Sequence, residues 1–119
     1  MKNSKTSDEL LQDGFEKICH LNSLQEYRGK RFIINDTQVA VFKIDGDVFA
    51  LYNICPHQQT ALIYDGLIED GCVVCPAHGW MFNLRTGKKP TGSNGLQVNP
   101  VELVDDEIFI KVTPKELRW

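Results

Sequence analysis

Short apolar runs separated by turn residues occupy most of the chain, and this pattern predicts β-strands. Three of the runs are rich in β-branched and aromatic residues: RFIIND (31–36), QVAVFKI (38–44) and VFALYN (48–53). Asn35-Asp36 and Asp45-Gly46 stand between these runs, and both pairs are turn signals, Asp-Gly being among the strongest for a hairpin. We therefore expect three successive strands joined by tight turns.

Further strands are expected on both sides of this meander. They cover FEKICHL (15–21), CVVC (72–75), MFNLRTG (81–87) and VELVDDEIFIKV (101–112), the last of these a hairpin that turns at Asp105-Asp106. Residues 23–29 could form one helical turn or a loop, and residues 88–100 are expected to form a turn-rich loop. Many short strands with no convincing long helix indicate an all-β protein, an antiparallel β-sandwich or barrel.

The chain is expected to fold as one domain over residues 14–119, preceded by a polar tail, residues 1–13, that is loosely attached. A stretch at about 53–82 interrupts the strands with two loops that begin at Cys55-Pro56 and Cys75-Pro76. We expect these loops to form a small subdomain, because functional residues often lie on loops that a rigid scaffold positions.

Composition and charge restrict the function classes. The formal net charge of −3 argues against nucleic acid as the main partner, since phosphate binding needs a basic face. No stretch approaches the ~20 apolar residues of a membrane span, and the start, MKNSKTSDELLQDG, has no apolar signal segment. We therefore expect a cytoplasmic protein without a membrane partner. Its four cysteines would stay reduced, as metal ligands or buried thiols.

Two cysteines and two histidines have the spacing of a metal site. The pattern is Cys55-x-His57, then residues 58–74, then Cys75-x-x-His78. Three interpretations are open: a four-coordinate structural zinc, a 2Fe–2S cluster in which two His replace two Cys on one iron, or four unrelated residues. Zinc sites of this composition usually pair Cys with Cys and His with His. Here each loop supplies one Cys and one His, as a cluster with one sulfur-bound and one nitrogen-bound iron requires.

The motif and its surroundings resemble those of a known family. VAVFKIDGDVFALYNICPH (39–57) is similar to the strand pair and first cluster loop of Rieske ferredoxins, and CPAHGWMFNLRTG (75–87) is similar to their second loop and following strand. The chain also resembles the Rieske-like small subunit of assimilatory NAD(P)H nitrite reductase. HGWMFNLRTG (78–87) and the Gly95-Leu96 segment favour this second type.

This resemblance implies a Rieske fold with one 2Fe–2S cluster. Cys55 and Cys75 would hold one iron, and His57 and His78 would hold the other iron near the surface. It also implies a ferredoxin-type electron carrier. Its donor would be a flavin-containing reductase, and its acceptor an oxygenase or the large subunit of a nitrite reductase.

Four positions predict a low reduction potential. High-potential Rieske proteins clasp their loops with a disulfide, but this chain has Thr60 and Ala77 where those cysteines would stand. Trp80 and Phe82 replace a Ser and a Tyr that donate hydrogen bonds to sulfur in that subfamily. Fewer such bonds stabilise the reduced cluster less, so we expect the lower end of the Rieske range of roughly −150 to +300 mV.

The remaining residues do not predict catalysis by this chain alone. Once His57 and His78 are used, only His20 is left as a histidine ligand, and no dinucleotide-binding glycine motif follows a strand. Cys19 and Cys72 are expected to be core thiols, and His20 a surface residue. An electron-transfer component of an oxygenase or nitrite reductase system is therefore expected, and the alternative is a zinc-containing interaction module without redox function.

Overall fold

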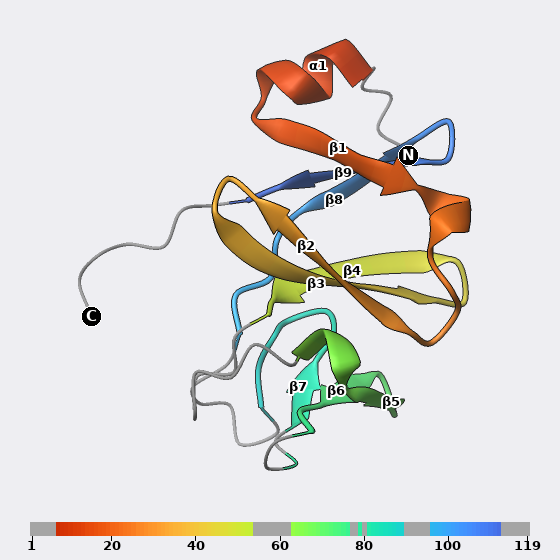
Figure 1. Cartoon of the computed structure of the whole chain (residues 1–119), viewed down its shortest axis with the longest axis vertical. Helices are drawn as coiled ribbons and strands as arrows, with labels where there is room; N and C mark the ends of the chain where they lie inside the picture. The colour runs from red at the N-terminus through yellow and green to blue at the C-terminus, as the bar shows by residue number, and fades with distance from the viewer. Residues whose placement is uncertain (1–6, 54–62, 77–78, 80, 90–95, 113–119) are drawn as a thin grey trace, which may run out of the picture.

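The computed structural model describes residues 7–53, 63–76, 79, 81–89 and 96–112, and within them the chain forms three three-stranded antiparallel sheets (Figure 1). The first has the order β1-β9-β8, with β1 at Phe15–His20, β9 at Glu107–Lys111 and β8 at Val101–Val104. The second has the order β2-β3-β4, with β2 at Gly29–Ile34, β3 at Thr37–Ile44 and β4 at Asp47–Tyr52. The third has the order β5-β6-β7, with β5 at Leu67–Glu69, β6 at Cys72–Val74 and β7 at Met81–Asn83. The all-β prediction is confirmed.

The second sheet is the middle layer, with the first sheet on one side of it and the third on the other (Figure 1). Successive side chains of a strand point to opposite faces of its sheet. Val39 and Val41 of β3 accordingly pack in one hydrophobic cluster with β9. Ala40 and Phe42 pack in another with β6 and β7. Both faces of β3 are covered, so its central residues are buried. This explains why residues 39–42 form a continuous apolar run in the sequence.

Two-residue turns join four pairs of adjacent strands. These turns are Asn35-Asp36, Asp45-Gly46, Asp70-Gly71 and Asp105-Asp106, and every one of these residues has a positive φ. Two positive φ values match the twist of antiparallel strands, and Asn, Asp and Gly adopt them at the lowest cost. The three predicted turns, at Asn35-Asp36, Asp45-Gly46 and Asp105-Asp106, are therefore confirmed.

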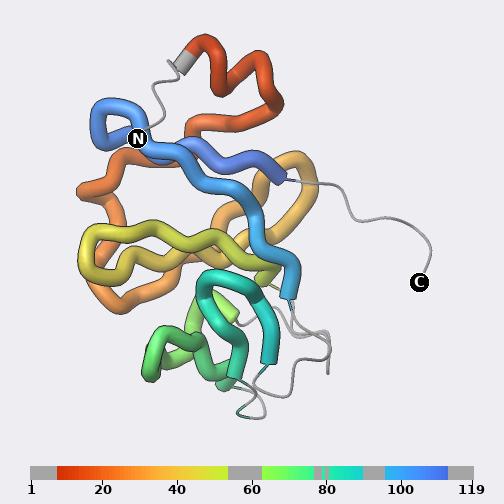
Figure 2. The backbone as a smooth tube through the Cα atoms, turned by 180° about the vertical axis from the view of Figure 1, so that it is seen from behind, coloured from red at the N-terminus to blue at the C-terminus, as the bar shows by residue number. Residues whose placement is uncertain are grey.

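The segment from Leu96 to Val101 connects the third sheet to the first along the edge of β4 (Figure 2). It pairs with β4 through an isolated bridge between Val98 and Leu51. The Asn99 N–H also donates to the Ala50 carbonyl at 2.8 Å. This segment therefore extends the middle sheet locally before the chain enters β8.

The expectation of a loosely attached tail is wrong for residues 7–12. Ser7–Gln12 forms helix α1, and Leu10 is fully buried against Phe15 and Phe109. One buried leucine in an otherwise polar stretch gives too weak a periodic pattern to identify a helix. The packing surface for Leu10 is created only when β9 lies beside β1.

Three local assignments also differ from the expectation. Strand β5 was not expected, because it is only three residues long and contains just two apolar residues, Leu67 and Ile68. Strand β7 ends at Asn83, since the Asn83 Oδ1 atom accepts hydrogen bonds from the N–H groups of Arg85 and Thr86 and turns the chain. Residues 24–28, for which a helical turn or a loop was expected, form a loop, and the 3-10 helix η1 lies just before them at Leu21–Ser23. In the part of the chain that the structure describes, no helix is both long and apolar enough to span a membrane.

Candidate metal centre

Cys75 is the one predicted ligand that lies among the described residues. Cys55, His57 and His78 lie outside them, as do Thr60, Ala77, Trp80 and the Gly95 of the nitrite-reductase-like segment. The Cys75 side chain is fully buried in the cluster that contains Val73 and Phe82. A cysteine at the end of a strand and inside an apolar cluster offers a soft sulfur ligand that is shielded from water.

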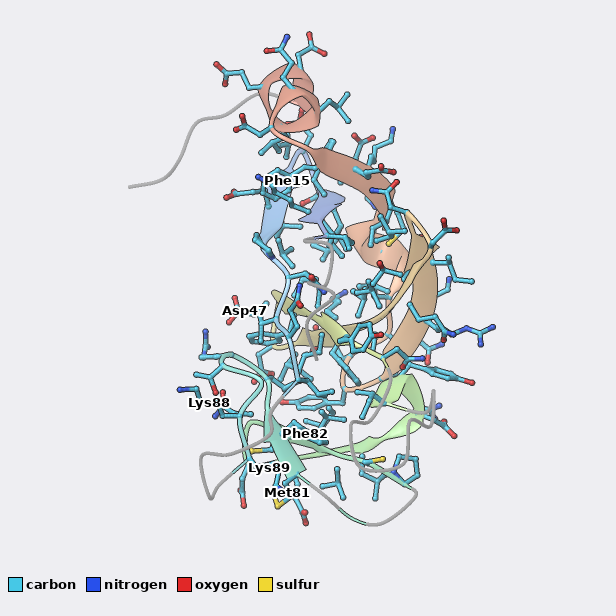
Figure 3. All side chains as sticks on the ribbon, turned by 90° about the vertical axis from the view of Figure 1, so that its left-hand side faces the viewer. Phe15, Asp47, Met81, Phe82, Lys88 and Lys89 are labelled. Carbon is cyan, nitrogen blue, oxygen red and sulfur yellow. The ribbon has the colours of Figure 1, made fainter. Side chains whose placement is uncertain are left out.

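The β6–β7 hairpin presents the second loop. Val73 pairs with Phe82 and Val74 pairs with Met81, so Cys75 follows directly after a closed ladder. The Gly79 N–H donates to the Cys75 carbonyl at 2.8 Å, and Gly79 has a φ of +75°, which a side chain would disfavour. Met81 and Phe82 lie at the end of the molecule that is opposite Phe15 (Figure 3).

The first loop is held at its base by Asn53, a residue that the sequence did not single out. Asn53 ends the apolar run of β4 and is fully buried. Its carbonyl accepts from the Ile63 N–H at 3.2 Å, and its Oδ1 atom accepts from the Tyr64 N–H at 2.8 Å. The two ends of the segment 54–62 are thereby brought together. The sequence signal for it is weak: a polar asparagine that directly follows an apolar run, two residues before Cys55.

The 3-10 helix η2, Ile63–Asp65, packs closely against its neighbours. A Cβ atom at Gly66 would collide with the Val74 carbonyl oxygen, and one at Gly29 would collide with the Tyr64 carbonyl oxygen. Glycine is therefore required here for close backbone contact rather than for an unusual φ. These contacts place the end of the first loop beside β6, from which the second loop starts.

The other two cysteines in the described residues differ from Cys75 in burial. Cys72 and Cys19 are half-buried. The prediction that both are core thiols is therefore only partly confirmed. Burial raises the pKa of the Cys72 thiol, and the Asp70 carboxylate raises it further. Burial also raises the pKa of Cys19, which Lys30 partly offsets. His20 is exposed, as predicted, and its Nδ1 accepts from the Asn22 N–H at 3.2 Å.

The residues present fit an iron–sulfur ligand set better than an exposed zinc knuckle. Cys75 is completely buried, whereas Cys72, three positions earlier, is half-buried and pairs across the sheet with Glu69 and Asn83. A Cys-x-x-Cys chelate would need both sulfur atoms on one side, and the strand separates them. A buried cysteine sulfur is the type of ligand by which proteins hold iron–sulfur clusters.

Charged side chains surround the third sheet. Asp65, Glu69 and Asp70 are exposed on the side of η2 and β5, and Arg85 and Lys88 are exposed after β7. This distribution gives the subdomain an acidic and a basic region, either of which can steer a charged protein partner.

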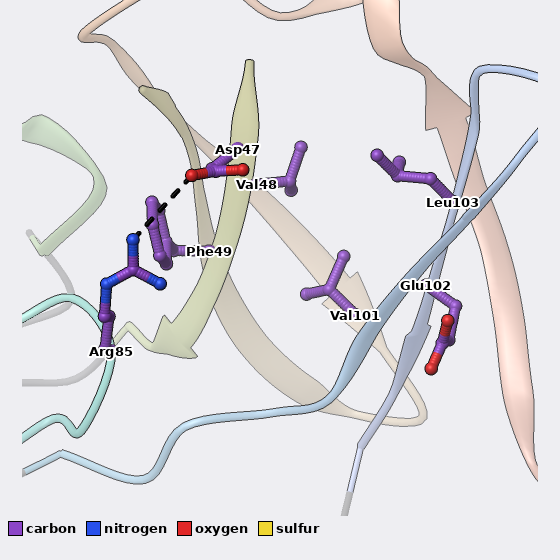
Figure 4. A pocket seen from close by; sticks show the side chains of 7 residues that line it. All are labelled: Asp47, Val48, Phe49, Arg85, Val101, Glu102 and Leu103. Atoms are coloured by element: carbon purple, nitrogen blue, oxygen red, sulfur yellow. Dashed lines mark ion pairs between the residues drawn. The ribbon is translucent and has the colours of Figure 1, made fainter. Parts of the chain in front are cut away.

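A shallow pocket of about 340 Å³ lies between β4 and β8 (Figure 4). It is lined by Asp47, Val48, Phe49, Arg85, Val101, Glu102 and Leu103. Cys75 does not line it, so this pocket is distinct from the candidate metal centre.

Comparison with known proteins gives one consistent family. Residues 14–99 match the family model described as "Rieske [2Fe-2S] domain". The ferredoxin component of the alkene monooxygenase system of Xanthobacter autotrophicus is 30% identical over 106 residues, which cover 87% of each chain. The NAD(P)H nitrite reductase of Emericella nidulans is 36% identical over 91 residues, which cover 68% of this chain and 8% of that protein. A crystal structure described as the NADH-dependent nitrite reductase small subunit of Mycobacterium tuberculosis superposes with a TM-score of 0.78 at 25% identity, covering 84% of this chain and 96% of that one.

Proposed function

The chain belongs to the Rieske 2Fe–2S domain family, and we propose that its cluster is held by the four residues of the double Cys/His motif, Cys55, His57, Cys75 and His78. Membership identifies the chain as an electron-transfer protein with a Rieske-type 2Fe–2S cluster. The observation that supports the ligand assignment is the burial of Cys75 at the end of β6, in contrast to the half-buried Cys72.

Each ligand has a defined task in this proposal. The thiolates of Cys55 and Cys75 hold one iron, and ring nitrogens of His57 and His78 hold the other. The cluster supplies one-electron storage. The protein holds together the residues that flank the ligand loops, through the β6–β7 ladder for the second loop and through Asn53 for the first.

The proposed potential is low, at the negative end of the roughly −150 to +300 mV range of Rieske centres. Phe82 is fully buried beside Cys75 in the same apolar cluster, and its ring offers no hydrogen bond to sulfur. An apolar surrounding disfavours the additional negative charge of the reduced cluster. Such a carrier suits a flavin-containing reductase as its donor.

The proposed acceptor is the oxygenase of a multicomponent system. The support is the relative from the alkene monooxygenase system, which is a separate ferredoxin component and matches this chain over 87% of its length. The alternative acceptor is the large subunit of a nitrite reductase, which the similarity to the nitrite reductase small-subunit structure favours. We also propose a cytoplasmic location, where the ligand thiols stay reduced.

Low-temperature EPR of the dithionite-reduced, anaerobically purified protein tests this function. We expect a rhombic signal with an average g below that of all-cysteine 2Fe–2S clusters. Cys75→Ser should abolish the signal, whereas Cys72→Ser, a matched change three residues earlier at the start of β6, should retain it. A silent spectrum with zinc in the metal analysis would contradict the proposal. Copurification with a large subunit would distinguish the nitrite reductase alternative from a free ferredoxin.

A further inference from the structure

We infer that Asn53 is a positioning residue for the cluster: it bonds to Tyr64 on the far side of the first ligand loop and anchors this link to Gln38 of strand β3. The inference rests on the proposed assignment of Cys55 and His57 as ligands. Asn53 itself is two residues before Cys55 and is fully buried. Its side chain therefore acts on the backbone that carries the ligands rather than on the cluster.

The two ligand loops are closed in different ways. The second loop leaves β6 and enters β7, which are paired strands, so a ladder of backbone hydrogen bonds holds its ends together. The first loop leaves β4 and enters the 3-10 helix η2. A strand and a 3-10 helix share no ladder, and the Asn53 carbonyl and Oδ1 instead accept from the N–H groups of Ile63 and Tyr64.

Gln38 of β3 fixes the orientation of the Asn53 amide. The Asn53 Nδ2 donates to Gln38 Oε1 at 3.1 Å, and the Asn53 N–H donates to the Gln38 carbonyl at 3.0 Å. With Nδ2 directed at Gln38, Oδ1 is directed at the Tyr64 N–H. At the Tyr64 end of this hydrogen-bond network, the Arg31 guanidinium lies over the Tyr64 ring, 5.8 Å from its centre.

Asparagine suits this buried position because its side chain donates and accepts at once. Aspartate would keep the acceptor for Tyr64 but lose the donor to Gln38, and it would add a charge at a site without solvent. Leucine has the same branching and can make neither bond. The amide is therefore the neutral group that can bridge β3 and η2, and a buried network of this kind favours a single geometry.

The consequence is a specific effect on the cluster. Without the side-chain bridge, the backbone bond from the Ile63 N–H to the Asn53 carbonyl remains, but the Tyr64 N–H loses its acceptor and the link to Gln38 is lost. The position of η2 relative to β3 is then less precisely fixed, and we expect a wider range of ligand geometries. Changes in residues that orient metal ligands typically cost about 10- to 100-fold in metal affinity. We therefore expect faster cluster loss and broader EPR lines, rather than a change in stability alone.

The test uses the holoprotein with three variants. Asn53→Leu removes both side-chain bonds, and Gln38→Met removes only the acceptor for Nδ2. Glu26→Met is the matched control: Glu26 accepts from the N–H groups of Asp45 and Gly46 in the β3–β4 turn, distant in sequence from both ligand loops. The measurements are the rate at which a chelator bleaches the visible spectrum, the EPR linewidth and the melting temperature.

Asn53→Leu should lose its cluster about tenfold faster than the wild type and show broadened g values, and Gln38→Met should be intermediate. Glu26→Met should lower the melting temperature and leave both cluster readouts unchanged. The inference is overturned if Asn53→Leu bleaches no faster than Glu26→Met. If Asn53→Leu does not fold, a wild-type bleaching rate in Gln38→Met overturns it. A wild-type protein without a Rieske signal overturns the ligand assignment and this inference together, whereas a wild-type signal with unaffected variants overturns this inference alone.

Discussion

Arg85, in the turn after β7, pairs with Asp47 at the start of β4. The Arg85 Nη2 and Asp47 Oδ2 atoms are 3.7 Å apart (Figure 4). The same guanidinium lies over the ring of Phe49, 5.2 Å from its centre. Arg85 thus connects the end of the third sheet to the middle sheet through one charged and one aromatic contact.

The aromatic contact is expected to be the larger of the two. The Arg85 and Asp47 side chains are 72% and 65% exposed, and exposed ion pairs contribute about 0–1 kcal/mol. A cation–π contact at an exposed site contributes about 0.5–1 kcal/mol. Urea denaturation should therefore show a loss of about 1 kcal/mol for Arg85→Ala and less than about 0.5 kcal/mol for Asp47→Asn. Equal losses in the two variants would contradict this order.

Helix α1 is expected to be attached through Leu10. Leu10 is fully buried whereas Leu11, its neighbour, is 53% exposed. Leu10→Ala should lower the free energy of unfolding by about 2–4 kcal/mol, because it removes buried methyl groups and leaves a cavity. Leu11→Ala is the control, with an expected change within about 0.5 kcal/mol. A Leu10→Ala protein as stable as Leu11→Ala would show that the helix contributes nothing to folding.

Asn99 is expected to lower the stability of the protein. Its side chain is 3% exposed, and neither Oδ1 nor Nδ2 has a hydrogen-bond partner among the described residues. A buried polar group without a partner costs about 1–3 kcal/mol. Asn99→Leu has the same branching without the polar atoms, so it should raise the free energy of unfolding by about 1–3 kcal/mol. A lower melting temperature in this variant would mean that the amide does have a partner in solution.

The Tyr27–Asp45 contact is expected to weaken in alkali. The Tyr27 hydroxyl donates to Asp45 Oδ1 at 2.9 Å, and this bond, with smaller contributions from burial, the Asp45 charge and Glu26, raises the pKa of Tyr27. The folded state therefore favours the protonated phenol. Its stabilising effect is complete below the pKa of the unfolded chain, about 10, and disappears as the pH rises through the higher folded-state pKa.

Comparison of wild type with Tyr27→Phe isolates this effect, because the other groups titrate alike in both proteins. The wild type should have the higher melting temperature at pH 7, and the difference should shrink above about pH 10. A difference that stays constant between these pH values would exclude the Tyr27 hydroxyl as its source.

The sequence alone predicted most of the strands, three of the turns and the motif that identifies the family. Turns such as Asp45-Gly46 and Asp105-Asp106 are readable because positive φ values favour particular residue types at adjacent positions. The double Cys/His motif is recognisable because the spacing of Cys55, His57, Cys75 and His78 is a local feature of the sequence. These are local properties, and neighbours in sequence are sufficient to express them.

Tertiary structure decided how the loops are held and which polar groups are buried. In the sequence, Asn53 is an ordinary polar residue at the end of a strand. Only the tertiary structure shows that its side chain bonds to Gln38 of β3 and to the Tyr64 N–H of η2. In the sequence, Leu10 is part of a polar stretch, and only the tertiary structure shows that it packs against Phe109 of β9. The Leu10 contact joins residues far apart in the chain and is stabilised by the burial of apolar surface. The Asn53 hydrogen bonds depend on buried partners that β3 and η2 supply, and no local pattern in the sequence records either arrangement.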